Sequence, residues 1–101
     1  MVNILLMPRL KNPYRSGRRA ERIVAERLSK KGWLIRLSKG SKGPWDIYAL
    51  KSGRKMLIQV KKGSSTFSRK ECRRLRREAR KRGAIAALAR YNRGKIIFRF
   101  V

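Results

Sequence analysis

Residues 46–62, DIYALKSGRKMLIQVKK, predict a β-hairpin, and this hairpin decides the fold of the chain. Apolar residues predominate in 46–50 and again in 56–62, as expected for two strands. Between them, residues 51–54 (KSGR) contain the Ser-Gly pair of a tight turn. The sequence therefore predicts two neighbouring antiparallel strands at the centre of a sheet.

The second strand of this hairpin carries different chemistry on its two faces. Side chains two residues apart in a strand project to the same side, so Gln59 and Lys61 share one face. Asp46, the sole aspartate of the chain, stands where a loop rich in glycine and proline enters the first strand. The opposite face is predicted to be the apolar one and is formed by Met56, Ile58 and Val60.

A first helix is predicted upstream of the hairpin, over about 17–31, with Ser16 as its N-cap and Gly32 at its end. Glu21 lies at the border of the apolar stripe of this helix, so we expect its side chain to point toward the body of the protein. The stripe consists of Ala20, Ile23, Val24 and Leu28.

A second helix is predicted downstream of the hairpin. Ser68 and Glu71 match a capping box, and the helix then runs to about Arg82 and stops at Gly83. Most of its other residues are arginine or lysine, and we interpret this cationic face as a surface that binds DNA rather than one that is only solvated.

Three further strands complete the expected order α-β-β-β-α-β-β. They lie at 33–37, at 84–89, whose continuous apolar run is typical of a strand buried on both faces, and at 96–101. We expect one domain over residues 1–101. Within it, 1–15 is an N-terminal segment that forms either an edge strand or a dimer contact, and 16–101 is the core.

The charge of the chain points to a polyanionic partner. Its 30 Lys and Arg residues exceed its 5 Asp and Glu residues to give a net charge of +25 in 101 residues. A phosphate backbone relieves the resulting repulsion and releases counterions. A single cysteine and no histidine exclude an intrachain disulfide and a structural zinc site, and they fit a reducing, intracellular setting. The apolar run at 2–7 is too short to span a membrane.

The few acids of this basic chain suggest metal chemistry. Oxygens from Asp46, Gln59 and Glu21 are ligands of the kind that Mg²⁺ prefers, and Lys61 can hold or activate a water beside a phosphodiester. The residues alone leave a structural alternative open, in which Asp46 bonds only to backbone and Lys61 is one of many surface lysines.

Four motifs in chain order support the chemical interpretation. They are GRRAER at 17–22, Ile35-Arg36 with Gly40-Ser41-Lys42, PWDI at 44–47, and IQVK at 58–61. With these motifs the sequence resembles the archaeal-type Holliday junction resolvases of the PD-(D/E)xK, or restriction-endonuclease-like, nuclease superfamily. The resemblance implies an α/β fold with a central mixed β-sheet flanked by helices.

The resemblance also implies residue roles. Glu21 is similar to the family's helical glutamate, Asp46 to its metal-binding aspartate, and Lys61 to its catalytic lysine. Gln59 stands where the family usually has a glutamate ligand, so the site carries one negative charge fewer and is expected to hold metal more weakly. The candidate catalytic residues are therefore Glu21, Asp46, Gln59 and Lys61, with the first three as metal ligands. The candidate DNA contacts are Arg22, Arg36, Ser41, Lys42, Arg69 and Arg73.

The expected function is a Mg²⁺-dependent endodeoxyribonuclease, with Mn²⁺ as a substitute, that resolves four-way DNA junctions by paired nicks. Its expected partners are branched DNA and a second copy of itself, with no membrane, in an archaeal cytoplasm or in host cytoplasm if the gene is viral. Two alternatives remain. One is another nuclease of this superfamily acting on branched DNA, and the other is a non-catalytic basic DNA-binding protein with the same fold.

Overall fold

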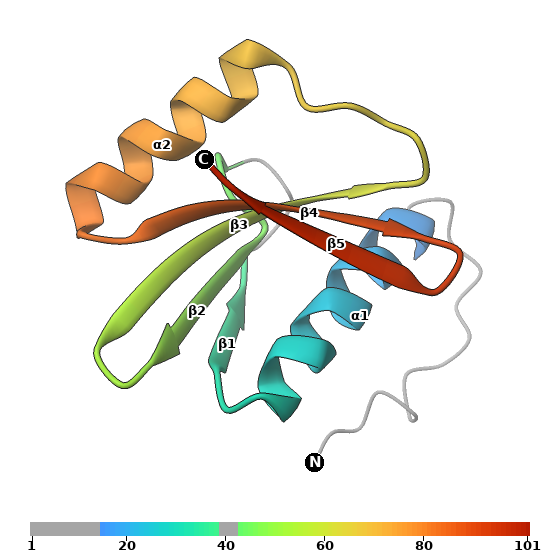
Figure 1. Cartoon of the computed structure of the whole chain (residues 1–101), viewed down its shortest axis with the longest axis horizontal. Helices are drawn as coiled ribbons and strands as arrows, with labels where there is room; N and C mark the ends of the chain where they lie inside the picture. The colour runs from blue at the N-terminus through green and yellow to red at the C-terminus, as the bar shows by residue number, and fades with distance from the viewer. Residues whose placement is uncertain (1–14, 39–42) are drawn as a thin grey trace.

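The computed structural model describes residues 15–38 and 43–101, and the side chains of 19–38 and 43–101. The expected strand near the N-terminus falls outside these ranges. The described residues follow the predicted order α-β-β-β-α-β-β (Figure 1). The elements are α1 (Arg15–Lys30), β1 (Leu34–Leu37), β2 (Ile47–Lys51), β3 (Arg54–Lys62), α2 (Arg69–Arg82), β4 (Ile85–Asn92) and β5 (Lys95–Phe100).

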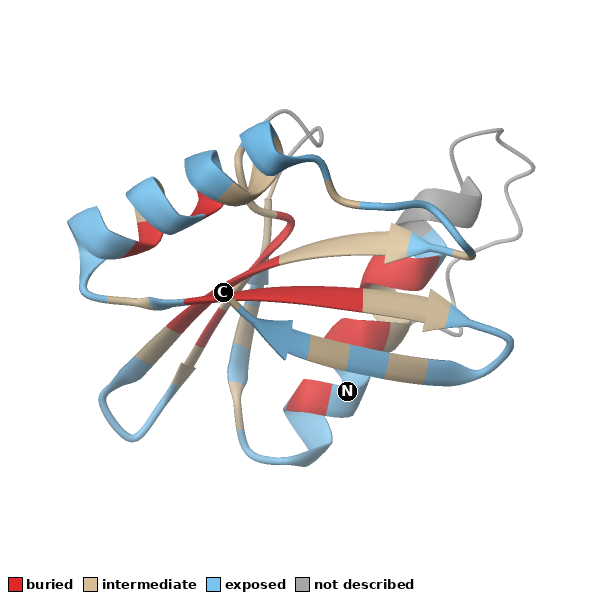
Figure 2. Ribbon diagram, turned by 45° about the horizontal axis from the view of Figure 1, so that its top comes forward, coloured by how far each residue is buried: buried red, intermediate tan, exposed pale blue. Residues whose placement is uncertain are grey.

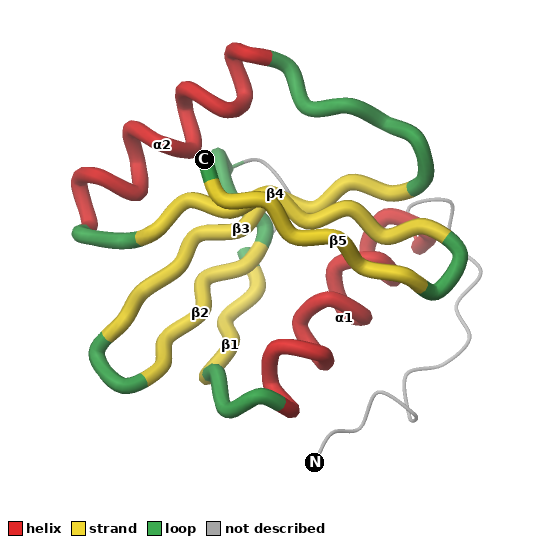
Figure 3. The backbone as a smooth tube through the Cα atoms, in the orientation of Figure 1, coloured by secondary structure: helices red, strands yellow, loops and turns green. Residues whose placement is uncertain are grey.

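The five strands form one mixed sheet in the order β1-β2-β3-β4-β5 (Figure 3). Strands β1, β2 and β3 pair antiparallel, and so do β4 and β5. Strands β3 and β4 are parallel, because the chain returns through α2 before it enters β4. The predicted mixed sheet is therefore confirmed.

The two helices cover opposite faces of the sheet. On one face α1 buries Val24 and Leu28 in a cluster with Ile58 of β3. On the other face α2 buries Leu75 and Ala79 in a second cluster, and Figure 2 shows that most of the rest of α2 is exposed. Neither α1 nor α2, within the ranges described, has both the length and the apolar character needed to cross a membrane.

The expectation that only one face of β3 is apolar is wrong. Leu57 is fully buried in the cluster under α2, although it shares a face with Gln59 and Lys61. The reason is that α2 packs over the middle of this face, so β3 is apolar on both sides at residues 56–58 and polar from Gln59 onward except for Val60. Gln59 and Lys61 therefore lie next to the hydrophobic cluster that contains Leu57.

The ends of the helices follow the sequence signals with one exception. The capping box of α2 is complete, and Gly83 ends the helix in the left-handed conformation with φ 65°. At the end of α1, Gly32 has φ 98°, and the amide of Trp33 donates to the carbonyl of Leu28 at 3.1 Å. Ser16 is not the N-cap, because α1 already begins at Arg15 and a cap residue requires a non-helical backbone.

Two hairpins end in two-residue turns of the same kind. Ser52 and Gly53 join β2 to β3, and Arg93 and Gly94 join β4 to β5. All four residues have positive φ, which matches the twist of antiparallel strands and favours glycine at the second position. These turns fix the antiparallel registers of β2 with β3 and of β4 with β5.

Candidate active site

Asp46 is bound into the sheet through both its backbone and its side chain. Its amide donates to the carbonyl of Ile58 at 2.8 Å, and its carbonyl accepts from the amide of Ser38 at 3.0 Å. The carboxylate Oδ2 accepts a third bond, from the amide of Val60 at 2.7 Å. The side chain thus supplies an acceptor for the Val60 amide, which lies beyond the Ile47–Ile58 pair that ends the ladder of β2 and β3.

Glu21 approaches the Asp46 carboxylate from α1. The side chains of Glu21 and Asp46 are hydrogen-bonded to each other, and the two residues are only 8% and 7% exposed. Burial raises the pKa of Asp46, against the lowering effects of the Val60 amide and the Lys61 ammonium. The prediction that Glu21 points inward is confirmed.

Lys61 lies on β3 and is held by α2. Its Nζ donates to Oε2 of Glu71 at 3.1 Å and lies 5.9 Å from the centre of the Phe67 ring. The pKa of Glu71 is lowered, chiefly by a hydrogen bond from the amide of Ser68 and further by Lys61. Glu71 therefore does two things at once, since it caps α2 and fixes the ammonium of Lys61.

The sequence alone predicts only the capping role of Glu71. A capping box identifies the first turn of a helix, but it carries no information on which strand that turn faces. Lys61 and Glu71 are 10 positions apart, and the segment between them includes an irregular connection, so neither helical nor strand spacing relates the two side chains. The ion pair becomes visible only in the fold.

Gln59, the third candidate metal ligand, also lies on β3. It is half-buried, precedes Lys61 by one side-chain repeat on the same face, and stands opposite Leu88 in the parallel register with β4. No cluster of three or more Asp, Glu, His or Cys side chains suited to a metal occurs in residues 15–38 and 43–101. The predicted ligand set contains two carboxyl groups, and its third member is the neutral amide of Gln59.

The predicted DNA contacts that the structure describes lie on α1, β1 and α2. Arg22 follows Glu21 on α1 and is half-buried, whereas Arg36 is exposed on the edge strand β1. Arg69 and Arg73 are exposed on α2. Ser41 and Lys42 were also predicted, and they lie outside the described residues.

Comparison with known proteins agrees with this architecture. The family profile described as "Restriction endonuclease" (Mrr_cat) matches residues 15–92. Among solved structures, Hjc of Archaeoglobus fulgidus, a Holliday junction resolvase from an archaeal hyperthermophile, superposes with a TM-score of 0.71 at 28% sequence identity. The match covers 84% of this chain and 70% of that chain. No curated protein sequence matches.

The family match spans α1 to β4 and therefore includes Glu21, Asp46, Gln59, Lys61 and Glu71. The chain belongs to the restriction endonuclease family.

Proposed function

We propose that this protein is a Mg²⁺-dependent endonuclease that resolves four-way DNA junctions by paired nicks. The observation that carries the proposal is the contact between the carboxyl groups of Glu21 and Asp46 at the end of β3 that bears Gln59 and Lys61. Structural similarity to an archaeal Holliday junction resolvase supports the choice of a branched substrate.

The residues present fit a divalent cation. Two buried carboxyl groups in contact repel when both are ionised, and burial already raises the pKa of Asp46. A cation at this position would relieve both costs. Asp46, Glu21 and the amide oxygen of Gln59 would hold it, and nucleases of this kind generally use divalent metals. Bound there, Mg²⁺ supplies positive charge at the phosphate that is cleaved, and Mn²⁺ offers the same chemistry.

Lys61 is the residue that lies beside the attacking water in the proposed reaction. Its ammonium is partly exposed, with 27% of its side chain accessible, and its ion pair with Glu71 limits the positions it can occupy. Held in this way, Lys61 can donate hydrogen bonds to a water or to a phosphate oxygen. Glu71 acts through Lys61 and is a positioning residue.

Two copies of the chain are part of the proposal. Each chain contributes a single Asp46–Glu21 pair, whereas paired nicks fall on two opposed strands of a junction. A two-fold symmetric dimer would present two identical sites to those strands.

A cleavage assay tests the proposal. A labelled four-way junction and a linear duplex of the same sequences are incubated with the protein in Mg²⁺ and, separately, in Mn²⁺. We expect symmetric paired nicks on the junction alone, and we expect Asp46→Asn to abolish them while it retains junction binding.

Other outcomes distinguish the alternatives. Nicking of linear duplex and junction alike would replace the proposal with a less selective nuclease of the same family. Tight binding with no cleavage in either metal would overturn catalysis. The neutral Gln59 is the feature that favours such a non-catalytic DNA-binding protein.

A further inference from the structure

A cationic groove lies on the α2 face of the sheet, beside the candidate active site. It encloses about 680 Å³ between α2 and the ends of β4 and β5. Five arginines line it, together with two phenylalanines, and the described lining residues include no Asp or Glu. The arginines are Arg69, Arg73 and Arg76 of α2, Arg90 of β4 and Arg99 of β5.

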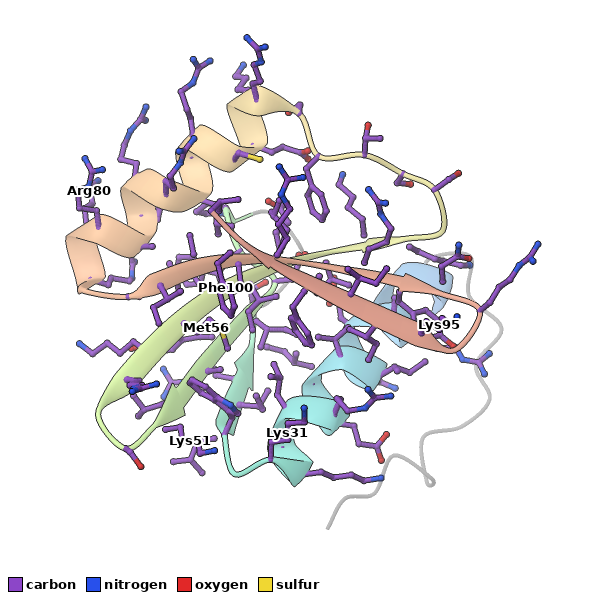
Figure 4. All side chains as sticks on the ribbon, viewed as in Figure 1. Lys31, Lys51, Met56, Arg80, Lys95 and Phe100 are labelled. Atoms are coloured by element: carbon purple, nitrogen blue, oxygen red, sulfur yellow. The ribbon has the colours of Figure 1, made fainter. Side chains whose placement is uncertain are left out.

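The arginines come from both walls of the groove. Arg69, Arg73 and Arg76 stand four and three residues apart, so they form one stripe along α2. Arg90 and Arg99 come from the sheet, and Arg99 stands opposite Leu88 of the α2 cluster in the register of β4 and β5. Figure 4 shows nitrogen-tipped side chains along α2, with Arg80 toward its C-terminal end. Arginine side chains therefore line the groove on both the α2 side and the sheet side.

Arg90 has a donor that the described protein leaves unused. Its Nε is buried and has no hydrogen-bond partner among the described residues. An unpaired buried donor costs about 1–3 kcal/mol, and the cost is larger for a charged group. The residue as a whole is only half-buried and lines the groove, and a guanidinium carries five N–H donors in a fork that matches two oxygens of a phosphate.

The groove is continuous with the candidate active site. Arg90 is the direct neighbour of Lys61 in the parallel register of β3 and β4, so the two side chains share a face. Phe67 lines the groove and also lies under the ammonium of Lys61. Glu71, which holds Lys61, precedes the groove residue Cys72 on α2. A strand that enters the site at Asp46 therefore meets the groove after it passes Lys61.

We infer that this groove binds the sugar-phosphate backbone of the DNA strand next to the phosphate that is cleaved, with Arg90 as its central phosphate ligand. The inference rests on the proposed function for the position of the cleaved phosphate. The groove itself is a binding surface outside the metal site, and it commits Arg76, Arg90 and Arg99 to DNA, in addition to Arg69 and Arg73.

DNA fits the groove better than a second copy of the chain does. A partner with the same net charge of +25 would bring more cations toward five arginines. Each phosphate that occupies the groove would instead release counterions and remove part of the repulsion along α2.

A matched pair of double variants tests the inference. Arg73→Gln with Arg76→Gln removes two charges from the groove, and Arg74→Gln with Arg77→Gln removes two exposed charges from other positions on α2. Both variants lower the net charge equally and place glutamine, a good helix former, in the same helix. Binding to a labelled junction is measured in EDTA across a salt series, so cleavage does not enter the result.

The groove variant is expected to lower the slope of log K against log salt by about 2, or roughly 0.9 for each lost phosphate contact. Its loss of affinity between about 50 and 200 mM salt should then be roughly tenfold smaller than that of the wild type. The control variant should keep the wild-type slope. Arg90→Lys, which keeps the charge but removes the guanidinium fork, should weaken binding while it keeps the slope.

Equal changes in the two double variants would show a diffuse field and overturn the inference, and so would no change in either. A groove variant that alters self-association of the free protein but not DNA binding would also overturn it and identify a second copy as the occupant. If the groove variant shows the expected change in DNA binding but the wild-type protein does not cleave DNA, the groove would stand as a binding surface. Only the proposed function would then be rejected.

Discussion

Lys61 of β3 and Glu71 of α2 form an ion pair with a distance of 3.1 Å between Nζ and Oε2. The same carboxylate accepts a hydrogen bond from the amide of Ser68 through Oε1, at 2.9 Å. One residue therefore links the start of α2 to the lysine of the candidate active site. Disturbing this residue is expected to affect cleavage before it affects the fold.

Glu71→Gln tests this link. Glutamine can still accept the capping bond from Ser68, because the capping box tolerates Glu or Gln at this position. It cannot form the ion pair, so Lys61 should sample more orientations and cleavage should slow roughly tenfold or more. Single-turnover cleavage of a junction measures the effect. Glu78→Gln, which removes an acid elsewhere on α2, is the control and should leave the rate unchanged; an unchanged rate in Glu71→Gln would reject the positioning role.

The difference in stability between the wild type and Glu71→Gln is expected to depend on pH. The pKa of Glu71 is held below its usual 4.5, first by the Ser68 amide and further by Lys61. A lowered pKa means that the ionised group stabilises the folded state above about pH 4.5, and that this stabilisation disappears as the pH falls through the folded-state pKa. The excess stability of the wild type over Glu71→Gln in urea unfolding should therefore shrink from pH 6 toward pH 3. A difference that stays constant would contradict this origin.

Asp46→Asn should separate catalysis from stability. The amide oxygen of asparagine can still accept the bond from the Val60 amide, and the variant no longer buries a carboxyl group whose pKa is raised by desolvation. We expect cleavage to be lost while the thermal midpoint at pH 7 without metal is unchanged or higher. Asp46→Ala is the comparison, because it leaves the Val60 amide without its acceptor and should cost about 1–3 kcal/mol. A large loss of stability in Asp46→Asn would show that the carboxylate is needed for the fold itself.

Gln59→Glu should supply the negative charge that the family resemblance implies at this position. A carboxylate holds Mg²⁺ more strongly than a neutral amide does, so half-maximal cleavage should occur at a lower Mg²⁺ concentration. Gln59→Leu has a similar size and no oxygen, and it should require more metal or lose activity while it still binds junction DNA. Identical metal titrations for the wild type and Gln59→Glu would exclude position 59 from the metal site.

The elements that the sequence predicted well are those with a local physical signal. The Ser-Gly turn at 52–53 and the capping box at Ser68 each fix a backbone conformation within four residues, and the structure contains both. The start of α1 was predicted less well. Ser16 carries a capping side chain, but the helix begins one residue earlier and makes it an interior position.

The contacts that make up the candidate site depended on more than local signals. The inward direction of Glu21 follows from the helical wheel. Its contact with Asp46 does not, because only the packing of α1 on the sheet brings the two residues together. The pairing of Lys61 with Arg90 depends on the parallel register of β3 and β4, which the crossover through α2 determines. Resemblance to a family pointed to Glu21, Asp46, Gln59 and Lys61, and their roles stay predictions.

The crowding of arginines on α2 gives salt two opposite effects on this protein. Arg69, Arg73 and Arg76 are like charges at helical neighbour spacing, which destabilises a helix by roughly 0.2–0.5 kcal/mol per pair. Added salt screens this repulsion, so the free protein should become more resistant to unfolding as ionic strength rises. The same salt competes for the phosphates that the arginines bind. At low ionic strength, therefore, bound DNA is expected to stabilise the folded chain, because it neutralises the same arginines that repel one another in the free protein.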